Sequence, residues 1–474
     1  MIFSGGLARH RVAVFAGLVA GAAAVLIPLA TSPREHAGGC PSAAQHNGLT
    51  VASGADVSLT GERRALIELW NRAHPDARAS LVEISSVADL QRSQMAAVQQ
   101  SHSCDYDVLV LDAPLTAEFA ESGAITPYPL PHGWDNDFLP GLKQSVTWKG
   151  TVYALPFNAD VGLLYSWNDA RSAPPVDLND LLGQAAEVAG HHFATGYSMQ
   201  FGDYEGATVN ALELIWGFHG DVMRGDQVVI GRPEIRAQVA EAVRALRNAT
   251  ASGGTAVGAP AQNATEASSI RDFVDHKVAF MRNWPYAFRV LAADPRMRDA
   301  AHHLRFGVSP LPGPTVLGGQ NLAISAYSRQ KQLAGQLIDF LTDPQHESRL
   351  FGCGGFAPTR ASAYERPQPC PGSSSAEQQI SQSELTQLGE QIKRALENAR
   401  LRPATPSYQD FSEALRGCVR SAIFGGTEID YGRFAGLLRN AFTGRAVPRG
   451  GVGTAAGRAD AGQAGNPGGA SPCG

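Results

Sequence analysis

The sequence lacks an excess of positive charge. Its 39 lysines and arginines stand against 44 aspartates and glutamates, which gives a net charge of −5 at pH 7. Proteins that bind nucleic acid by neutralising phosphates need a basic surface, so this balance disfavours a nucleic-acid partner. With 44% hydrophobic and 18% charged residues, the composition also argues against a fully disordered chain and against a protein with many membrane spans.

Familiar catalytic and cofactor-binding motifs are missing as well. The chain has no nucleophile elbow, phosphate-binding loop, zinc-protease motif or dinucleotide-binding glycine pattern in a suitable context. It also has no Cys-x-x-Cys pair or Cys/His cluster that would hold a metal ion. We therefore expect no cofactor, no metal and no catalytic residue. A glycosidase stays open as the alternative, because two carboxylates suffice for that chemistry.

The N-terminal segment has the pattern of an export signal. Arg9 and Arg11 precede an apolar run over residues 12–30. The run is also long enough to span a bilayer uncleaved. Small residues at 37–39 followed by Cys40 are similar to a bacterial lipobox. We expect an exported protein on the outer face of the cytoplasmic membrane, anchored by lipid at Cys40 or by an uncleaved N-terminal helix.

The six cysteines suit an oxidising compartment, where disulfides form. Cys353 and Cys370 flank a short Gly/Pro-rich stretch and are the first candidate pair. Cys104 and Cys418 are alternative partners for either of them. The tail, residues 443–474, is rich in Gly, Ala, Pro and Arg and is predicted to be disordered.

From residue 48 onward, short apolar runs alternate with helical periodicity. This order predicts an α/β protein with parallel strands. About 400 residues exceed what one core usually supports, so we expect two lobes. The predicted strands are 49–53, 79–84, 107–111, 152–155, 161–166, 278–282, 306–310 and 321–325, with a loop at 313–319. The predicted helices are 61–73, 87–100, 116–122, 178–190, 207–217, 233–251, 266–275, 331–342, 377–398, 408–424 and 431–442.

Polar and aromatic residues at the ends of these elements suit a sugar. Asp112 and Trp284 each follow a predicted strand, and Glu266 and Arg402 stand at a helix start and in a loop. Aromatic rings pack against the C–H faces of sugars, while carboxylates and guanidinium groups bind hydroxyls. The other tryptophans, Trp70, Trp148, Trp167 and Trp216, are predicted to lie in the core.

Five segments, in the same order along the chain, resemble the extracellular sugar-binding proteins of carbohydrate ABC importers. The resemblance is closest to actinobacterial trehalose- and maltose-type binding lipoproteins. The segments are Trp-Lys-Gly-Thr-Val-Tyr-Ala-Leu-Pro at 148–156, the helix, strand and Trp-Pro of 273–285, Leu-Pro-Gly through Gly-Gly-Gln-Asn-Leu-Ala-Ile-Ser at 311–325, Phe-Leu-Thr-Asp-Pro-Gln at 340–345, and Arg-Pro-Ala-Thr-Pro-Ser-Tyr at 402–408.

The resemblance implies a type II periplasmic-binding-protein fold, in which two α/β lobes joined by crossing strands close over a ligand. It implies a monomer that binds an α-linked disaccharide or oligosaccharide, changes no bond, and delivers the sugar to permease subunits in the membrane. Asp160 and Gln320 stand where the trehalose-type binders have Asn and Leu. Glu205 is a further candidate at a helix start, although Glu205 and Glu266 also suit a helix N-terminus electrostatically. The implied sugar-binding residues are Asp112, Asp160, Glu205, Glu266, Trp284, Gly319, Gln320 and Arg402.

The predicted organisation follows from these crossings and is accurate to several residues. Residues 1–47 form the signal or anchor and a tether, and residues 443–474 form the tail. Lobe one comprises residues 48–155 and 307–354, and lobe two comprises residues 156–306 and 355–442.

Overall fold

The protein was analysed as a computed structural model. It describes residues 48–85, 87–130, 133–170, 173–251, 256–367, 370, 380–446 and 473–474. The apolar run at 12–30, Cys40 and most of the predicted tail lie outside these ranges. Among the described helices, none has both the length and the apolar character needed to cross a membrane.

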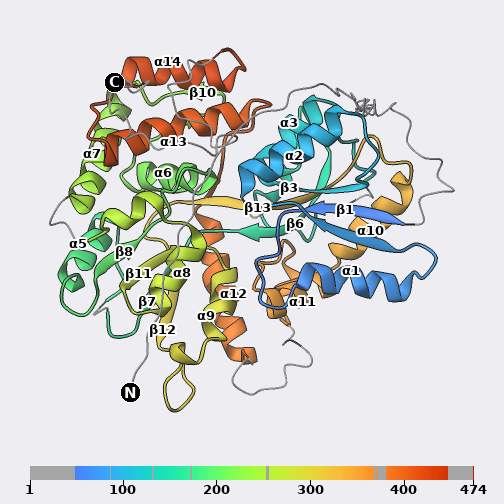
Figure 1. Cartoon of the computed structure of the whole chain (residues 1–474), viewed down its shortest axis with the longest axis horizontal. Helices are drawn as coiled ribbons and strands as arrows, with labels where there is room; N and C mark the ends of the chain where they lie inside the picture. The colour runs from blue at the N-terminus through green and yellow to red at the C-terminus, as the bar shows by residue number, and fades with distance from the viewer. Residues whose placement is uncertain are drawn as a thin grey trace, which may run out of the picture. The chain divides into compact units, whose positions relative to one another are not determined.

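The first sheet is built mainly from the N-terminal part of the chain (Figure 1). Its strands run in the order β14-β13-β3-β1-β2, and β6 also pairs with β13. Strands β2 and β3 both lie parallel to β1, whereas β13 is antiparallel to β3. The strands are β1 (Leu49–Ser53), β2 (Ala79–Glu83), β3 (Val108–Asp112), β6 (Ala154–Asp160), β13 (Thr315–Ile324) and β14 (Ala399–Leu401).

Helices cover both faces of this sheet, which explains why β3 is apolar at successive positions. Val108 and Val110 pack in one hydrophobic cluster with residues of α1 and α10, whereas Leu109 and Leu111 pack in the other with residues of α2 and α3. Figure 1 shows these two pairs of helices on opposite sides of the sheet. The helices are α1 (Glu62–Ala73), α2 (Ala88–Gln100), α3 (Thr116–Glu121), α10 (Lys331–Leu341) and α11 (Pro344–Arg349).

The second sheet has the order β12-β7-β11-β8. Strand β7 lies antiparallel to β11 and β12, and β8 lies parallel to β11. Its strands are β7 (Leu163–Trp167), β8 (Thr195–Ser198), β11 (Val278–Asn283) and β12 (Phe306–Pro310). The associated helices are α5 (Leu178–Val188), α6 (Glu205–Gly217), α7 (Pro233–Thr250), α8 (Glu266–Val274), α9 (Tyr286–Ala292), α12 (Gln382–Glu397), α13 (Tyr408–Phe424) and α14 (Tyr431–Phe442).

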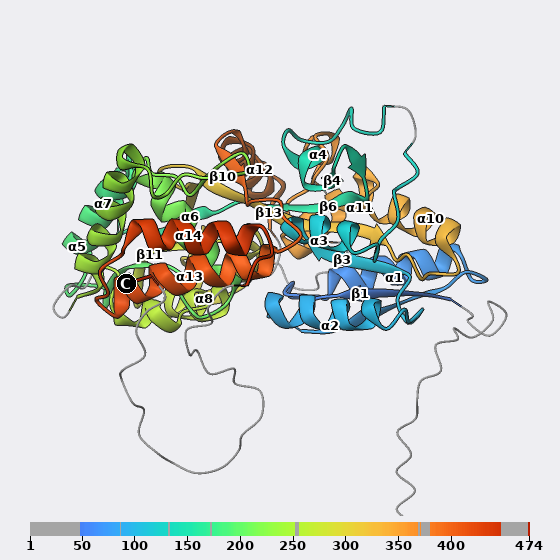
Figure 2. The same cartoon turned by 90° about the horizontal axis from the view of Figure 1, so that it is seen from above.

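Small elements complete the fold. Helices α13 and α14 lie side by side in both views (Figures 1 and 2). The remaining elements are α4 (Leu142–Ser145), the hairpin of β4 (Thr147–Trp148) with β5 (Thr151–Val152), and the hairpin of β9 (Met223–Arg224) with β10 (Gln227–Val228).

Strand β13 pairs within the first sheet and also contacts α6, a helix associated with the second sheet. Its first residues pair with β14, and near them Thr315 donates a hydrogen bond to Glu213 of α6. Its later residues pair with β6 and β3 of the first sheet. We refer to the first sheet with its helices as the first lobe, and to the second sheet with its helices as the second lobe.

Strand pairing corrects two predicted elements near this connection. Residues 313–319 were expected to form a loop, but β13 begins at Thr315. The strand predicted at 152–155 was expected to end before Pro156, but Pro156 lies inside β6. Within the first sheet β6 pairs only with β13, so the missing N–H of a proline is tolerated on its other side.

The lobe boundaries remain a prediction, which the sheets refine. Strand β6 extends the first sheet to Asp160, and β12 belongs to the second sheet. We propose crossings just after Asp160 and just after Pro310, rather than at Leu155 and Phe306.

Disulfides join segments near the C-terminus. Cys353 pairs with Cys370, the first candidate pair from the sequence. Cys418 of α13 pairs with Cys473, so the end of the predicted disordered tail is held against α13. Tail composition gave no sign of this contact, because a disulfide needs no apolar core around it.

Candidate functional site

Three neighbouring strands of the first sheet place polar side chains in one row. In the strand register, Gln320 of β13 stands opposite Asp112 of β3 on one side and Asn158 of β6 on the other. Paired residues of antiparallel strands point to the same face of a sheet. Asp160 lies two residues beyond Asn158 and therefore points to this face as well.

Two glycines of β13 shape the space beside this row. A Cβ at Gly318 would lie 3.4 Å from Asp160 Cβ and 3.6 Å from Trp284 Cη2, in ordinary van der Waals contact, so Gly318 lies directly between these two side chains. Gly319 has a φ of 113°, and a Cβ there would lie 2.1 Å from the carbonyl oxygen of Asn158. Gly319 is therefore required for the close approach of β6.

Trp284 follows β11 of the second lobe, and its ring lies near the polar row of the first sheet. Its indole N–H donates to Glu266 Oε1 at 3.3 Å, and Tyr204 donates to Glu266 Oε2 at 2.6 Å. The guanidinium carbon of Arg282 lies 3.6 Å from the centre of the Trp284 ring, in cation–π contact. Glu266 is the first residue of α8, but its carboxylate orients the indole instead of capping the helix, whose N-cap is Thr265.

Arg402 joins the lobes. Its two terminal nitrogens donate to both oxygens of Asp112, at 2.8 and 2.5 Å, and one of them also donates to Glu205 Oε1 at 2.8 Å. The Arg402 side chain is only 4% exposed. A fork of this kind fixes the position of the Asp112 carboxylate, at the end of β3, relative to that of Glu205, at the start of α6.

Two residues of α13 donate hydrogen bonds to Glu205. Tyr408 donates to Glu205 Oε1 at 2.5 Å, and Ser412 donates to Oε2 at 2.6 Å. Burial raises the pKa of the Glu205 carboxyl, and the nearby Asp112 adds to that rise, while Arg402 and the two hydroxyls oppose it. Glu205 therefore does more than favour a helix N-terminus. Sequence reasoning missed Tyr408 and Ser412, which lie more than 200 positions from Glu205.

Sequence reasoning also missed two arginines. Arg63 of α1 donates to Gln320 Oε1 at 3.0 Å and to Ser53 Oγ at 3.0 Å. Arg282 of β11 makes a bidentate ion pair with Glu213, at 2.9 and 2.8 Å. Nothing local marks Arg63, because its partner Gln320 lies 257 positions away.

Several polar atoms around this row have no hydrogen-bond partner although they are buried. They are Asn158 Oδ1, Arg63 Nε, Arg402 Nε and Arg282 Nη1. Buried polar atoms are nearly always paired in folded proteins, so a concentration of unpaired ones points to a polar ligand. The eight predicted residues thus form one continuous set, which we call the inner site: Asp112, Asp160, Glu205, Glu266, Trp284, Gly319, Gln320 and Arg402.

The other predicted positions have mixed outcomes. Trp70, Trp167 and Trp216 are buried as expected. Trp148 is not a core residue; it is half-buried, and its indole N–H donates to Glu121 at 2.7 Å. In the described part of the chain, Glu62 and the sulfurs of Cys353 and Cys370 have ligand-like spacing, but those sulfurs form a disulfide and offer no thiolate to a metal.

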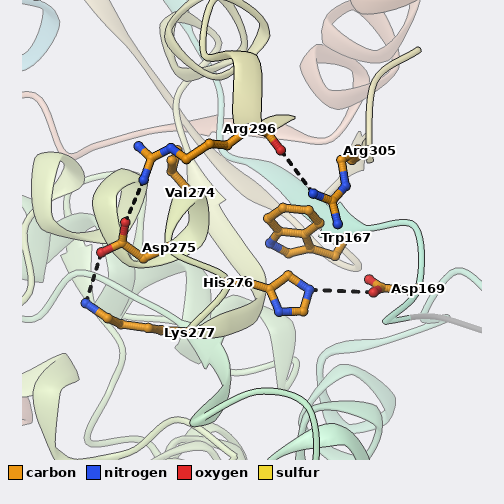
Figure 3. Close-up of a pocket in the computed structure, with 8 residues that line it drawn as sticks. All are labelled: Trp167, Asp169, Val274, Asp275, His276, Lys277, Arg296 and Arg305. Carbon is orange, nitrogen blue, oxygen red and sulfur yellow. Dashed lines mark hydrogen bonds and ion pairs between the residues drawn. The ribbon is translucent and has the colours of Figure 1, made fainter. Parts of the chain in front are cut away.

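A separate hollow of about 600 Å³ lies at the other end of the second sheet (Figure 3). It is lined by Trp167, Asp169, Val274, Asp275, His276, Lys277, Arg296 and Arg305, none of which belongs to the inner site. Asp275 forms ion pairs with Lys277 at 3.1 Å and with Arg296 at 3.0 Å. His276 lies 3.5 Å from Asp169. We call this the outer hollow.

Comparison with known proteins identifies the family. Residues 65–376 match the bacterial extracellular solute-binding proteins, a span of more than half the chain. The chain belongs to this family. A relative described as a probable ABC transporter-binding protein of Deinococcus radiodurans is 29% identical over 306 residues, which cover 60% of this chain and 70% of the relative.

Solved structures show the fold. Maltose-bound MalE3 of T. maritima matches with a TM-score of 0.70 and 24% identity, over 83% of this chain and 98% of its own. The GacH receptor of Streptomyces glaucescens, solved without ligand and with acarbose, matches with a TM-score of 0.69 and 20% identity, over 83% and 97%. The chain therefore has the two-lobed α/β fold of type II periplasmic-binding proteins, as the sequence predicted. Membership of an extracellular family agrees with the expected export.

Proposed function

We propose that this protein is the solute-binding component of an ABC importer. Its ligand is an α-linked disaccharide or oligosaccharide of the trehalose or maltose type, which binds at the inner site and passes intact to membrane permease subunits. The observation that carries the proposal is the bridge of Arg402 between Asp112 of the first lobe and Glu205 of the second.

The side chains of the inner site suit a sugar. Carboxylates accept hydrogen bonds from hydroxyls, an arginine fork donates two, and an indole packs on a pyranose face. The solved proteins of similar fold include one bound to maltose and one bound to acarbose, and the Deinococcus relative is named as a transporter-binding protein. The ligands of these proteins favour a saccharide over other solutes.

Lobe closure follows from where the groups lie. Asp112 and Gln320 belong to the first lobe, whereas Trp284, Glu266 and Glu205 belong to the second. A sugar that hydrogen-bonds to residues of both lobes stabilises the closed arrangement relative to the open one. The permease subunits then bind the closed arrangement. The protein acts as a monomer, tethered by lipid at Cys40 or by an uncleaved helix.

The alternative is a glycosidase on the same fold. That chemistry needs an acid and a second free carboxylate on either side of the scissile bond. Asp112 and Glu205 are instead bound to the same arginine, and Glu266 is hydrogen-bonded to Tyr204 and Trp284. Among the described residues, Asp160 has no such partners and could serve as the acid, but the other three carboxylates of the inner site are engaged and leave no second free one. These contacts favour binding over turnover. Release of glucose from the bound disaccharide, abolished by replacing one carboxylate, would establish the enzyme instead.

A thermal-shift panel tests the proposal. Trehalose, maltose, longer maltodextrins and sucrose should be compared with cellobiose as a β-linked control. A ligand that binds only the folded state raises the melting temperature, by an amount that grows with its concentration over Kd. An α-linked sugar is expected to raise it while cellobiose does not. Unchanged melting with every saccharide, and no heat on calorimetric titration, would overturn the sugar assignment.

A further inference from the structure

Among the described carboxylates of the inner site, Asp160 has the fewest and weakest partners. Asp112 and Glu205 are both bound to Arg402, and Glu266 receives two hydrogen bonds from its own lobe. Within the described chain, Asp160 forms no ion pair, and its side chain receives one long hydrogen bond, from Asn158 Nδ2 at 3.3 Å. It is therefore an acceptor with unused capacity.

A second acceptor lies beside it and is also unused. Asn158 is 1% exposed, and its amide nitrogen is the atom that bonds Asp160. Its oxygen, Oδ1, has no hydrogen-bond partner. Since residues two apart on a strand share a face, Asn158 and Asp160 present an amide oxygen and a carboxylate next to each other. Such a pair needs a group that donates several hydrogen bonds.

The charged residues around Asn158 and Asp160 indicate which charge the donor group of a ligand should carry. The charged groups that act on Asp160 are Arg63 of α1, Asp112 of β3, Arg282 of β11 and Arg402 after β14, and Tyr165, Tyr286 and Tyr364 also lie within its electrostatic range. Arg282 is neutralised by Glu213. The remaining arginines, Arg63 and Arg402, face four carboxylates at Asp112, Asp160, Glu205 and Glu266. The site is therefore short of positive charge.

An aromatic ring lies next to this pair. Trp284 Cη2 and Asp160 Cβ would both contact a Cβ placed at Gly318, at 3.6 and 3.4 Å. Arg282 lies over the Trp284 ring, and the carbons of a sugar ring pack on an aromatic face. Trp284 therefore suits the ring of the ligand, and Asp160 and Asn158 suit its donor group.

We infer that the sugar accepted at the inner site carries a protonated amine, which donates to the Asp160 carboxylate and to Asn158 Oδ1. This inference rests on the proposed function and narrows its ligand to amino sugars. No bond is formed or broken. The amine supplies donors to these two acceptors and a positive charge next to Asp160.

Matched ligands test the inference by calorimetry. Glucosamine is compared with glucose and with N-acetylglucosamine, and 2-amino-2-deoxytrehalose is compared with trehalose. Each amine is expected to bind about 10- to 100-fold more tightly than its neutral parent, the range of a hydrogen bond between charged groups. N-acetylation removes the charge and is expected to abolish the gain.

A variant and a pH series locate the effect. Asp160→Asn keeps the shape of the side chain and is expected to bring the ratio of amine to neutral affinity close to one. Asp169→Asn, the same change in the outer hollow, should leave the ratio unchanged. Burial raises the pKa of Asp160 to about 7, so in the wild type the ratio should rise between pH 5.5 and 7 as the carboxylate ionises. Any effect of Glu205 on affinity is the same for the amine and for its neutral parent, so it does not change the ratio of the two affinities.

The outcomes separate the two proposals. Binding of neutral sugars with no advantage for the amine, or an advantage that survives in Asp160→Asn, would overturn the inference and leave the proposed function intact. If Asp160→Asn fails to fold, a ratio that does not change with pH in the wild type overturns the inference. Failure of every sugar, neutral or aminated, would overturn both.

Discussion

The inner site and the outer hollow are both rich in charge, but they use it differently. In the outer hollow, Asp275 pairs with exposed Lys277 and Arg296, whose side chains are 54% and 61% exposed. In the inner site, the Arg402 and Glu205 side chains are 4% and 9% exposed. Exposed ion pairs contribute little, whereas breaking a buried pair is costly.

The size of a hollow is therefore a poor guide to function in this protein. The outer hollow has the volume, about 600 Å³, but its charges largely satisfy one another at the surface. The inner site has buried unpaired atoms at Asn158, Arg63 and Arg402, and an unpaired carboxylate at Asp160. Unused hydrogen-bonding capacity in a buried place is the stronger indication of a ligand.

Replacing an arginine in each region should give the largest contrast. Arg402→Ala leaves Asp112 and Glu205 buried without a cation, so the free energy of unfolding should fall by about 3–5 kcal/mol and sugar binding should be lost. Arg305→Ala in the outer hollow removes an arginine that lies 5.0 Å from the Trp167 ring, and should change stability by about 0.5 kcal/mol or less. Urea unfolding and calorimetric titration measure both effects. Equal losses in the two variants would break the distinction between the regions.

Replacing a tryptophan should mainly affect binding. Trp284→Ala removes the ring that faces the inner site, and sugar affinity should fall about 10-fold or more. Trp148→Ala is the matched control, because Trp148 is also half-buried but bonds to Glu121 in the first lobe. The Trp148→Ala variant should bind the sugar with the same affinity as the wild type. Retained affinity in Trp284→Ala would remove the stacking role.

The pH dependence of stability should reveal Asp160. Its folded pKa is raised to about 7, so the protonated form is favoured in the folded state. Its stabilisation is complete below the ordinary pKa near 4 and is lost as the pH rises through 7. Without ligand, the wild type should lose about 1–2 kcal/mol more than Asp160→Asn between pH 5 and 7.5, after allowance for solvent screening. Glu347, whose pKa burial raises to about 8, is present in both proteins. Parallel pH curves for the two proteins would contradict the assigned pKa.

An ion pair of intermediate exposure should give the smallest effect. Arg416 of α13 donates to Asp89 of α2 at 2.9 Å, with side chains 7% and 21% exposed, and so connects the lobes. It also donates to Ser412, which holds Glu205. Asp89→Asn should weaken sugar binding about two- to threefold at low salt and hardly at all at 1 M salt. Calorimetry at two salt concentrations measures this. A loss as large as that of Arg402→Ala would show that burial does not set the ranking.

The sequence was most informative where the chemistry is local. The apolar run at 107–111 predicted a strand buried on both faces, and the carboxylate of Asp112, which follows it, lies in the inner site. Tyr408–Phe424 was predicted to the residue by its apolar periodicity. Arg63, Tyr408 and Ser412 were missed because their roles depend on partners hundreds of positions away, which only the fold brings near. The pairing of Cys418 with Cys473 was missed for the same reason.

Hydrogen–deuterium exchange with and without saturating maltose tests the central claim most directly. The account predicts slower exchange in both lobes at once, at the segments containing Asp112, Trp284, Gln320 and Arg402, with no change around Asp275 and Lys277. Protection confined to the outer hollow, or to one lobe alone, would contradict a sugar site shared between the lobes.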